Sequence, residues 1–202
     1  MSFCIGLTGG IGCGKSKATE IFAQLGAGVV DTDVISRELT AAGGAAMKAV
    51  ATEFGRDYVL PDGGLDRPRM RALVFTDSAA KRKLESILHP LIRAASHQRI
   101  GAATEPYVIL IVPLLLETGA YRELLDRILV VDCDEDQQVA RTMARSGLTE
   151  DEVRAIMAAQ LPRSERLKRA DDVLHNDDDI KSLHSQIETL HLRYLEAARN
   201  AN

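Results

Sequence analysis

The sequence has no long hydrophobic run and little surplus charge, and both absences limit what the chain can do. No stretch of its 202 residues approaches the roughly 20 consecutive apolar residues of a transmembrane helix. The N-terminus also lacks the basic region and apolar run of a signal peptide. A net charge of −4 argues against a broad nucleic-acid-binding surface. We therefore expect a cytoplasmic protein that binds neither membranes nor nucleic acids, and that is a monomer or a weak homo-oligomer.

Cysteine is scarce as well. Cys4, Cys13 and Cys133 are odd in number and lack the spacing of metal ligands, which indicates reduced thiols in a cytosolic protein. We interpret Cys13 as a small side chain in a loop whose backbone does the binding, and the alternative is a redox-sensitive thiol.

What the chain does contain is a series of strand-length apolar runs that alternate with helical patterns. The expected strands are 3–7, 28–31, 107–112, 127–132 and a weaker fifth at 172–175. Such continuous runs are typical of strands that are buried on both faces. Their alternation with helices predicts an α/β fold with a parallel sheet. No strand is evident between Val30 and Tyr107, so we expect a helical insert there, interrupted at His89-Pro90.

The segment Gly9–Ser16 follows the pattern G-x-x-x-x-G-K-S of a phosphate-binding P-loop. An apolar run precedes it and an amphipathic helical pattern follows it, as this loop requires. Glycines let the backbone N–H groups approach phosphate oxygens closely, and the helix N-terminus adds partial positive charge. The pattern predicts that Lys15 reaches the β- and γ-phosphates and that the Ser16 hydroxyl binds Mg²⁺.

Two carboxylates follow the second expected strand. Asp33 is placed to accept a proton from a substrate hydroxyl, or to hold Mg²⁺ through water. It also suits the N-cap of the next helix, and the sequence alone leaves these alternatives open. For Asp31 we favour a structural role or an outer-shell contact to the metal.

Two absences narrow the class of P-loop protein. The run 107–112 ends in Pro113 rather than in the carboxylate that usually helps to hold the metal. The guanine-reading motif N-K-x-D is also missing, since Asn176 is followed by three aspartates. Both favour a small-molecule kinase over a motor ATPase or a switch GTPase.

Four arginines are spaced as in a phosphate-binding lid. Arg141 and Arg145 share one helical face, and Arg163 and Arg166 lie in a basic segment nearby. The guanidinium group has a permanent charge and a planar fork of donors, which suit it to phosphate. The alternative for each arginine is a solvated helix face.

Taken in order, the motifs resemble those of the dephospho-CoA kinase family. They are L-T-G-G-I-G-x-G-K-S at 7–16, D-x-D at 31–33, L-D-R at 65–67 with V-F at 74–75, H-P-L-I at 89–92, V-P-L-L-x-E at 112–117, V-V-D at 130–132, R-T-M-x-R at 141–145, A-A-Q at 158–160 and A-D-D-V-x-x-N at 170–176. The ordered series is far more specific than the P-loop alone.

This resemblance implies a P-loop kinase fold like that of the nucleoside-monophosphate kinases, with a five-stranded parallel sheet. It implies a nucleotide-binding core (1–34, 101–138 and 170–202), a helical coenzyme A-binding insert (35–100) and a lid (139–169). The implied reaction is ATP-dependent phosphorylation of the ribose 3′-hydroxyl of dephospho-coenzyme A, which completes coenzyme A synthesis. Another P-loop kinase with a nucleotide or nucleoside acceptor, and a nucleotide-dependent switch module, remain the alternatives.

The resemblance also implies residue roles. Asp33 becomes the general base, Lys15 and Arg141 stabilise the transferring phosphate, and Mg²⁺ accompanies ATP. The ATP-binding candidates are Gly9, Gly12, Cys13, Gly14, Lys15, Ser16, Lys17, Arg145 and Asn176. The candidates for the dephospho-coenzyme A site are Asp33, Arg67, His89, Leu114, Leu115 and Glu117.

Two positions depart from the family pattern. Lys17 stands where the family usually has Thr, and Asp177–Asp179 stand where it usually has Gly. The second departure leaves the packing around adenine open, but not the reaction.

Overall fold

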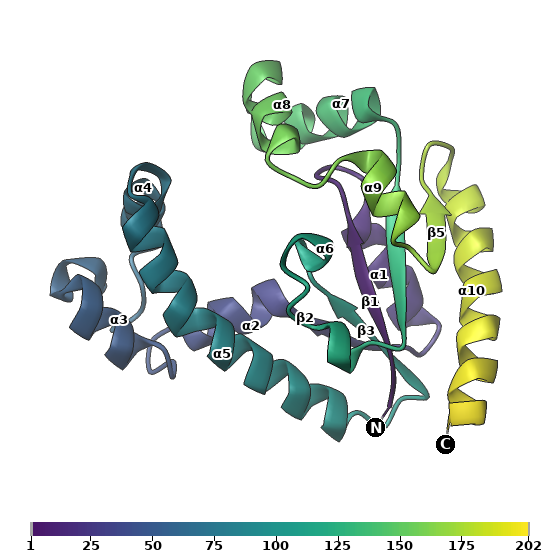
Figure 1. Cartoon of the computed structure of the whole chain (residues 1–202), viewed down its shortest axis with the longest axis horizontal. Coiled ribbons are helices and arrows are strands. Elements are labelled where there is room, and N and C mark those ends of the chain that lie inside the picture. The colour runs from purple at the N-terminus through teal and green to yellow at the C-terminus, as the bar shows by residue number, and fades with distance from the viewer. Residues whose placement is uncertain (1, 202) are drawn as a thin grey trace. The chain divides into compact units, whose positions relative to one another are not determined.

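The computed structural model describes residues 2–201, which divide into two compact units (Figure 1). The first unit takes the described residues up to Val30 and those from Ile100 onward. The second unit is Asp31–Arg99. Within residues 2–201, no helix combines the length and apolar character that crossing a bilayer would demand.

A five-stranded sheet forms the centre of the first unit, in the order β2-β3-β1-β4-β5. The strands are β1 (Phe3–Gly9), β2 (Gly28–Asp31), β3 (Tyr107–Ile111), β4 (Arg127–Asp132) and β5 (Asp172–His175). β1 pairs in parallel with β3 and β4, and β4 pairs in parallel with β5. The predicted α/β fold with a parallel sheet is confirmed.

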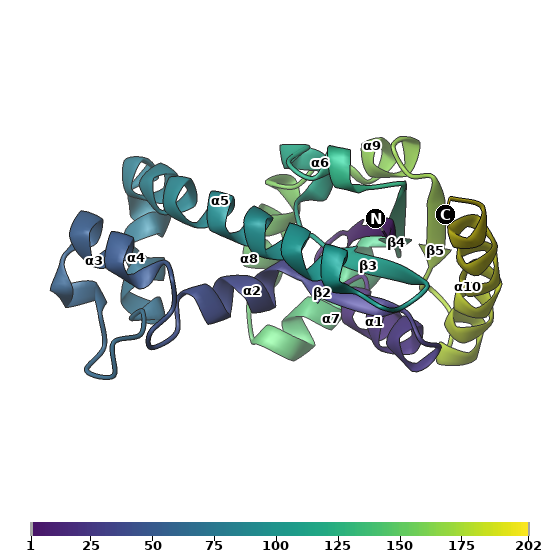
Figure 2. The ribbon, with the colours of Figure 1, turned by 90° about the horizontal axis from the view of Figure 1, so that it is seen from below.

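Helices cover both faces of this sheet because its strands are apolar on both faces; every residue of β3 is buried. In Figure 2, α6 and α9 lie on one side of the sheet and α1 lies on the other. The helices of this unit are α1 (Lys15–Gln24), α6 (Leu115–Thr118), α7 (Glu135–Ser146), α8 (Glu150–Ala158), α9 (Arg163–Lys168) and α10 (Ile180–Ala201), with a 3₁₀ turn η2 at Arg122–Leu124. A capping box, in which the side chains of Thr149 and Glu152 bond each other's backbone N–H groups, starts α8.

The last helix, α10, packs one apolar face against α1 and the sheet. Leu183, Ile187, Leu190 and Tyr194 are all buried there, as their helical spacing predicts. The Tyr194 ring stacks on Phe22 of α1 with 6.1 Å between centroids. This contact places the chain's C-terminal helix in the same core as its first helix.

A buried carboxylate ties β4, β5 and α10 together. Asp172 is 6% exposed and accepts hydrogen bonds from Arg127 (2.8 Å), Arg193 (2.8 Å) and Tyr194 (3.0 Å). Burial raises the pKa of Asp172, but these hydrogen bonds and the two arginine charges outweigh it, so the net pKa lies below its usual value.

The second unit is helical and has its own small core. It contains α2 (Thr32–Leu39), α3 (Met47–Phe54), a 3₁₀ turn η1 (Arg56–Tyr58), α4 (Arg67–Thr76) and most of α5 (Ser78–Ala102). Ala46, Met47, Val50, Leu65 and Met70 form the buried cluster. The expectation of an interruption at His89-Pro90 was wrong, because α5 runs through Pro90 without a break. Proline removes one N–H donor and crowds the carbonyl four residues earlier, and here that carbonyl belongs to the exposed Ser86, where water can solvate it.

Candidate active site

The P-loop joins β1 to α1, and glycine is required along it for geometric reasons. Gly12 and Gly14 have φ values of +74° and +95°, in the left-handed region that favours glycine. A Cβ on Gly12 would lie 2.6 Å from both the Gln138 carbonyl oxygen and Thr142 Oγ1. A Cβ on Gly14, which is the N-cap of α1, would collide with Asn176 Nδ2. The backbone is therefore packed closely against α7 and the chain after β5.

The ammonium group of Lys15 is bonded to its own loop. Lys15 Nζ donates to the carbonyl oxygens of Gly9 (2.8 Å) and Gly10 (2.9 Å). This places a positive charge at the rim of the loop, where the sequence pattern expects the triphosphate.

Ser16, the second residue of α1, is exposed, and its hydroxyl has no hydrogen-bond partner within residues 2–201. Mg²⁺ in kinases takes one or two protein oxygens, with phosphate oxygens and waters completing its octahedron. A single uncommitted hydroxyl at the end of the P-loop fits that donor set.

Two side chains from other parts of the chain bond the P-loop backbone, and a third supports one of them. Gln160, between α8 and α9, accepts from Ile11 N at 3.1 Å, and Asn176 Nδ2 donates to Cys13 O at 2.8 Å. Arg141 on α7 donates to the Asn176 carbonyl at 2.9 Å. Of the predicted site residues, Asn176 and Arg141 thus lie at the P-loop, and Arg141 reaches it through Asn176.

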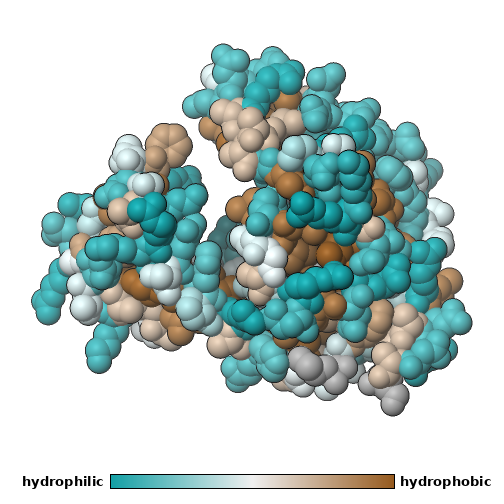
Figure 3. Space-filling view, viewed as in Figure 1, coloured by the Kyte–Doolittle hydropathy of each residue, from teal (hydrophilic) through white to brown (hydrophobic). Residues whose placement is uncertain are grey.

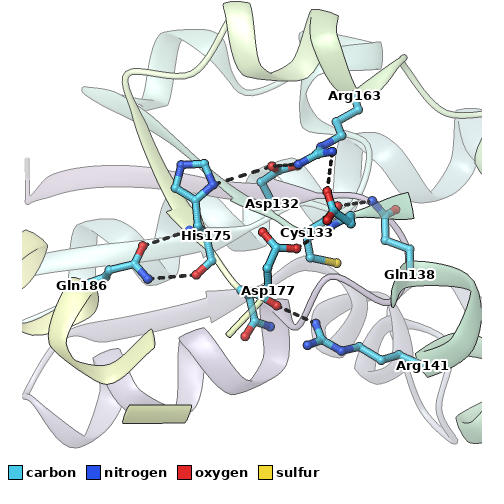
Figure 4. A network of polar contacts seen from close by, with 10 residues as sticks. Asp132, Cys133, Gln138, Arg141, Arg163, His175, Asp177 and Gln186 are labelled. Carbon is cyan, nitrogen blue, oxygen red and sulfur yellow. Dashed lines mark hydrogen bonds and ion pairs between the residues drawn. The ribbon is translucent and has the colours of Figure 1, made fainter. Parts of the chain in front are cut away.

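An ion-pair network at the end of β4 anchors α9 (Figure 4). Asp132 is 3% exposed and binds Arg163 with both oxygens, at 2.8 and 2.7 Å, while Asp134 accepts from the same guanidinium at 2.9 Å. The hydrogen bonds that Arg163 donates to Asp132 and Asp134 outweigh the cost of burial and hold the pKa of Arg163 above its usual value. His175 Nδ1 lies 3.8 Å from Asp132 on the other side.

The first of the three unusual aspartates, Asp177, belongs to the same region. Its carboxylate, labelled in Figure 4, accepts from Asp134 N at 2.6 Å. Its carbonyl accepts from Gln137 Nε2 at 2.9 Å. The loop after β5 is therefore bonded to the start of α7 by a residue that departs from the family pattern.

Two polar side chains at the P-loop were missed by sequence reasoning. Gln138 Nε2 donates to Cys133 O at 2.9 Å, but Gln138 Oε1 and Thr142 Oγ1 are buried and have no partner in the described chain. Both are among the first atoms that a side chain on Gly10 or Gly12 would meet. Their spacing of four on α7 was the available signal, since it places both on one helix face.

All three thiols are buried and free. Burial raises the pKa of the Cys13 thiol, although the neighbouring charges of Lys15 and Arg166 oppose the change. Burial also raises the pKa of Cys133 to about 11. A thiol with a raised pKa is a poor nucleophile, which favours the interpretation of Cys13 as a small packing residue.

The remaining candidates in the first unit lie away from the P-loop contacts just described. Lys17 pairs with Glu20 at 2.9 Å on the exposed side of α1, and Arg145 is exposed on α7. Leu114 is exposed, whereas Leu115 is 2% exposed and contacts the sheet at Gly6. Glu117 accepts from Leu161 N at 2.9 Å and so connects α6 to the segment before α9.

Leu115 also lines a cavity of about 370 Å³ on the α6 side of the sheet. Its lining is Leu115, Leu116, Gly119, Arg122, Leu125, Ile128 and Arg169, and contains no P-loop residue. Figure 3 shows hydrophobic surface in the region of α6.

In the second unit, Asp31 caps α2: its Oδ1 accepts from Asp33 N (2.8 Å) and Val34 N (3.3 Å). The capping role that the sequence left open for Asp33 therefore belongs to Asp31, and Asp33 is an exposed residue in the first turn. Arg67 donates to Arg37 O and Thr40 Oγ1, and His89 is exposed on α5.

Comparison with known proteins assigns this arrangement to a family. The family model for dephospho-CoA kinase matches residues 3–182. The chain belongs to the dephospho-CoA kinase family. Relatives of the same name in Nitrosospira multiformis and Dechloromonas aromatica are 54% identical over 197 residues and 57% identical over 194 residues. The Nitrosospira match covers 98% of this chain and 98% of the relative, and the Dechloromonas match covers 96% of this chain and 94% of the relative.

Solved structures agree with this fold. TT1252 from Thermus thermophilus has a TM-score of 0.79 at 32% identity, covering 95% of this chain and 97% of its own. Two other structures share the fold. Dephospho-CoA kinase from Campylobacter jejuni has a TM-score of 0.73 at 24% identity, covering 98% of this chain and 99% of its own. Shikimate kinase from Bacteroides thetaiotaomicron has a TM-score of 0.57 at 16% identity, covering 95% of this chain and 97% of its own. The dephospho-CoA kinase family thus has a P-loop kinase fold, and the predicted fold and family are both confirmed.

Proposed function

We propose that this chain transfers the γ-phosphoryl group of ATP to the ribose 3′-hydroxyl of dephospho-coenzyme A, giving coenzyme A and ADP. The observation that carries the proposal is the family match over residues 3–182 together with a fully formed P-loop between β1 and α1. We place this activity in the cytoplasm, which is consistent with three unpaired thiols.

The proposed mechanism begins with the P-loop. Its inward N–H groups and the N-terminus of α1 bind the triphosphate, and Lys15 turns from the Gly9 and Gly10 carbonyls to the phosphate oxygens. Arg141 and Asn176 hold the loop against the chain that follows β5. The fixed positive charges then spread the negative charge that develops on the transferring group.

Asp33 is the proposed general base. The acceptor hydroxyl oxygen attacks the γ-phosphorus, the bond from that phosphorus to the bridging oxygen of ADP breaks, and the hydroxyl proton passes to the Asp33 carboxylate. Since Asp31 occupies the N-cap of α2, the capping role does not compete for the Asp33 side chain.

Ser16 is the protein ligand that we propose for Mg²⁺, which when bound neutralises phosphate charge. We propose that the acceptor is bound by Arg67, His89, Leu114, Leu115 and Glu117. We propose that Lys17 and Arg145 also bind ATP. We also propose that 35–100 binds the coenzyme A portion and that 139–169 acts as the lid.

The test is an acceptor assay with purified protein, ATP and Mg²⁺. With dephospho-coenzyme A we expect ADP and coenzyme A in equal amounts, measured by chromatography. Adenosine, AMP and shikimate serve as competing acceptors. Faster ADP release with any of these would assign a different small-molecule kinase. ATP binding without acceptor-dependent ADP release would instead indicate a switch module.

A further inference from the structure

Arg166 on α9 is a buried cation without a counter-charge. The residue is 7% exposed, and its guanidinium donates to the carbonyl oxygen of Leu161. No carboxylate within residues 2–201 forms an ion pair with it. A buried charge is costly unless it is paired, so an anionic group that binds beside Arg166 gains a strong interaction.

The guanidinium of Arg166 points at the P-loop. A Cβ built on Gly10 would lie 2.9 Å from Arg166 Nη2 and would collide with Gln138 Oε1, so both side chains lie against this glycine. Lys15 Nζ is bonded to the Gly10 carbonyl from within the loop. The side chains of Lys15 and Arg166 therefore both approach Gly10, in the first half of the P-loop.

Arg163, one helical turn earlier on the same short helix, has the opposite arrangement. Its charge is neutralised by two oxygens of Asp132 and one of Asp134. Arg163 therefore fixes α9 to the end of β4, and the position of Arg166 over the P-loop follows from that attachment. Gln160, in the segment leading into α9, adds a second contact to the loop at Ile11.

We propose that Arg166 is a catalytic residue that binds the terminal phosphate of ATP, and that Arg163 is the positioning residue that keeps it there. The γ-phosphate supplies the negative charge that pairs with Arg166. The buried Gln138 Oε1 beside Gly10 is available to accept an N–H of the same guanidinium. This inference rests on the proposed nucleotide use of the chain, but not on the identity of the acceptor.

The test compares Arg166→Met with Arg169→Met by calorimetric titration with ADP and with non-hydrolysable β,γ-imido-ATP, both with Mg²⁺. Arg169 is a matched control because it is exposed and bonds to Leu116 O instead of facing the P-loop. For Arg166→Met we expect affinity for imido-ATP to fall about 10- to 100-fold, the range for a charge-assisted hydrogen bond. Affinity for ADP should change by less than about threefold, and Arg166→Lys should be intermediate.

Thermal unfolding of the nucleotide-free variants separates this role from a structural one. Removing an unpaired buried charge should leave the midpoint of Arg166→Met unchanged or higher, because methionine fills the space without a charge to desolvate. A lower midpoint, an equal loss of ADP and imido-ATP affinity, or no loss of either would overturn the proposal. None of these measurements involves the acceptor, so a wrong acceptor would leave the result intact.

Discussion

Asp31 and Asp33 are separated by one residue, but their side chains have different surroundings. The Asp31 carboxylate accepts two backbone N–H groups at the start of α2, whereas Asp33 is exposed within the first turn. The sequence could place both after a strand, because the apolar run ends there. It could not say which one caps the helix, since both residue types and positions suit an N-cap.

Separate substitutions of the two aspartates should have different effects: one should lower turnover and the other should lower stability. Asp33→Asn should lower kcat about 10²- to 10⁴-fold by removing the proton acceptor, with the affinity for ATP nearly unchanged. Asp31→Ala should instead destabilise the protein by about 1 kcal/mol, the usual cost of a lost cap. Steady-state kinetics and urea unfolding measure both. Near-normal turnover in Asp33→Asn would show that another group takes the proton.

The Cys13 thiol should be dispensable for nucleotide binding. Its carbonyl is held by Asn176, and its side chain is buried with a raised pKa. Cys13→Ala should therefore bind ADP within about twofold of the unaltered protein. In native protein at pH 7.5, iodoacetamide should modify Cys13 slowly, because the thiol is protonated and covered. Rapid labelling, followed by mass spectrometry and blocked by ATP, would show a reactive thiol instead.

At the scale of the element, the strands were predicted well. β2, β4 and β5 have the predicted bounds, because each is a short apolar run bordered by glycine or charged residues. The contacts that α7, α9 and the segment between α8 and α9 make to the P-loop were not predictable. They join residues more than 100 positions apart, such as Ile11 and Gln160, and the intervening fold determines them. The sequence predicted one shared role for four arginines. In the structure, Arg163 pairs with carboxylates, whereas Arg141 and Arg166 donate to backbone carbonyls.

The Asp132–Arg163 pair should control how firmly α9 is held. Asp132→Asn removes one charge from a bidentate contact, so we expect a loss of about 1–3 kcal/mol in the free energy of unfolding. Hydrogen exchange of 159–169 should also become faster, because Asp134 is then the one carboxylate left to Arg163 among its described contacts. Arg154→Met is the control, since that arginine pairs only with exposed carboxylates and should cost under about 1 kcal/mol. Equal exchange in both variants would show that α9 is held by other contacts.

At the scale of the whole chain, α10 shares one core with β1 and α1, and Asp172 bonds α10 to β4 and β5. Because the pKa of Asp172 is lowered in the folded state, its contribution to stability is present above its unfolded pKa of about 3.9. That contribution is lost as pH falls through the folded pKa. Asp172→Asn should lower the free energy of unfolding by about 3–5 kcal/mol at pH 7. The difference from the unaltered protein should shrink below about pH 4, as thermal unfolding across pH would measure. A difference that is constant with pH would show that the packing of the side chain matters, and not its charge.

The resting bonds of Lys15 have a consequence for the timing of nucleotide capture. The Lys15 ammonium group donates to two carbonyl oxygens of its own loop, so these hydrogen bonds stabilise the loop conformation without a nucleotide. In the proposed mechanism ATP displaces both carbonyl oxygens from Lys15, so nucleotide binding is a ligand exchange at this ammonium group. The residue that we propose for phosphate binding thus also stabilises the P-loop without a nucleotide.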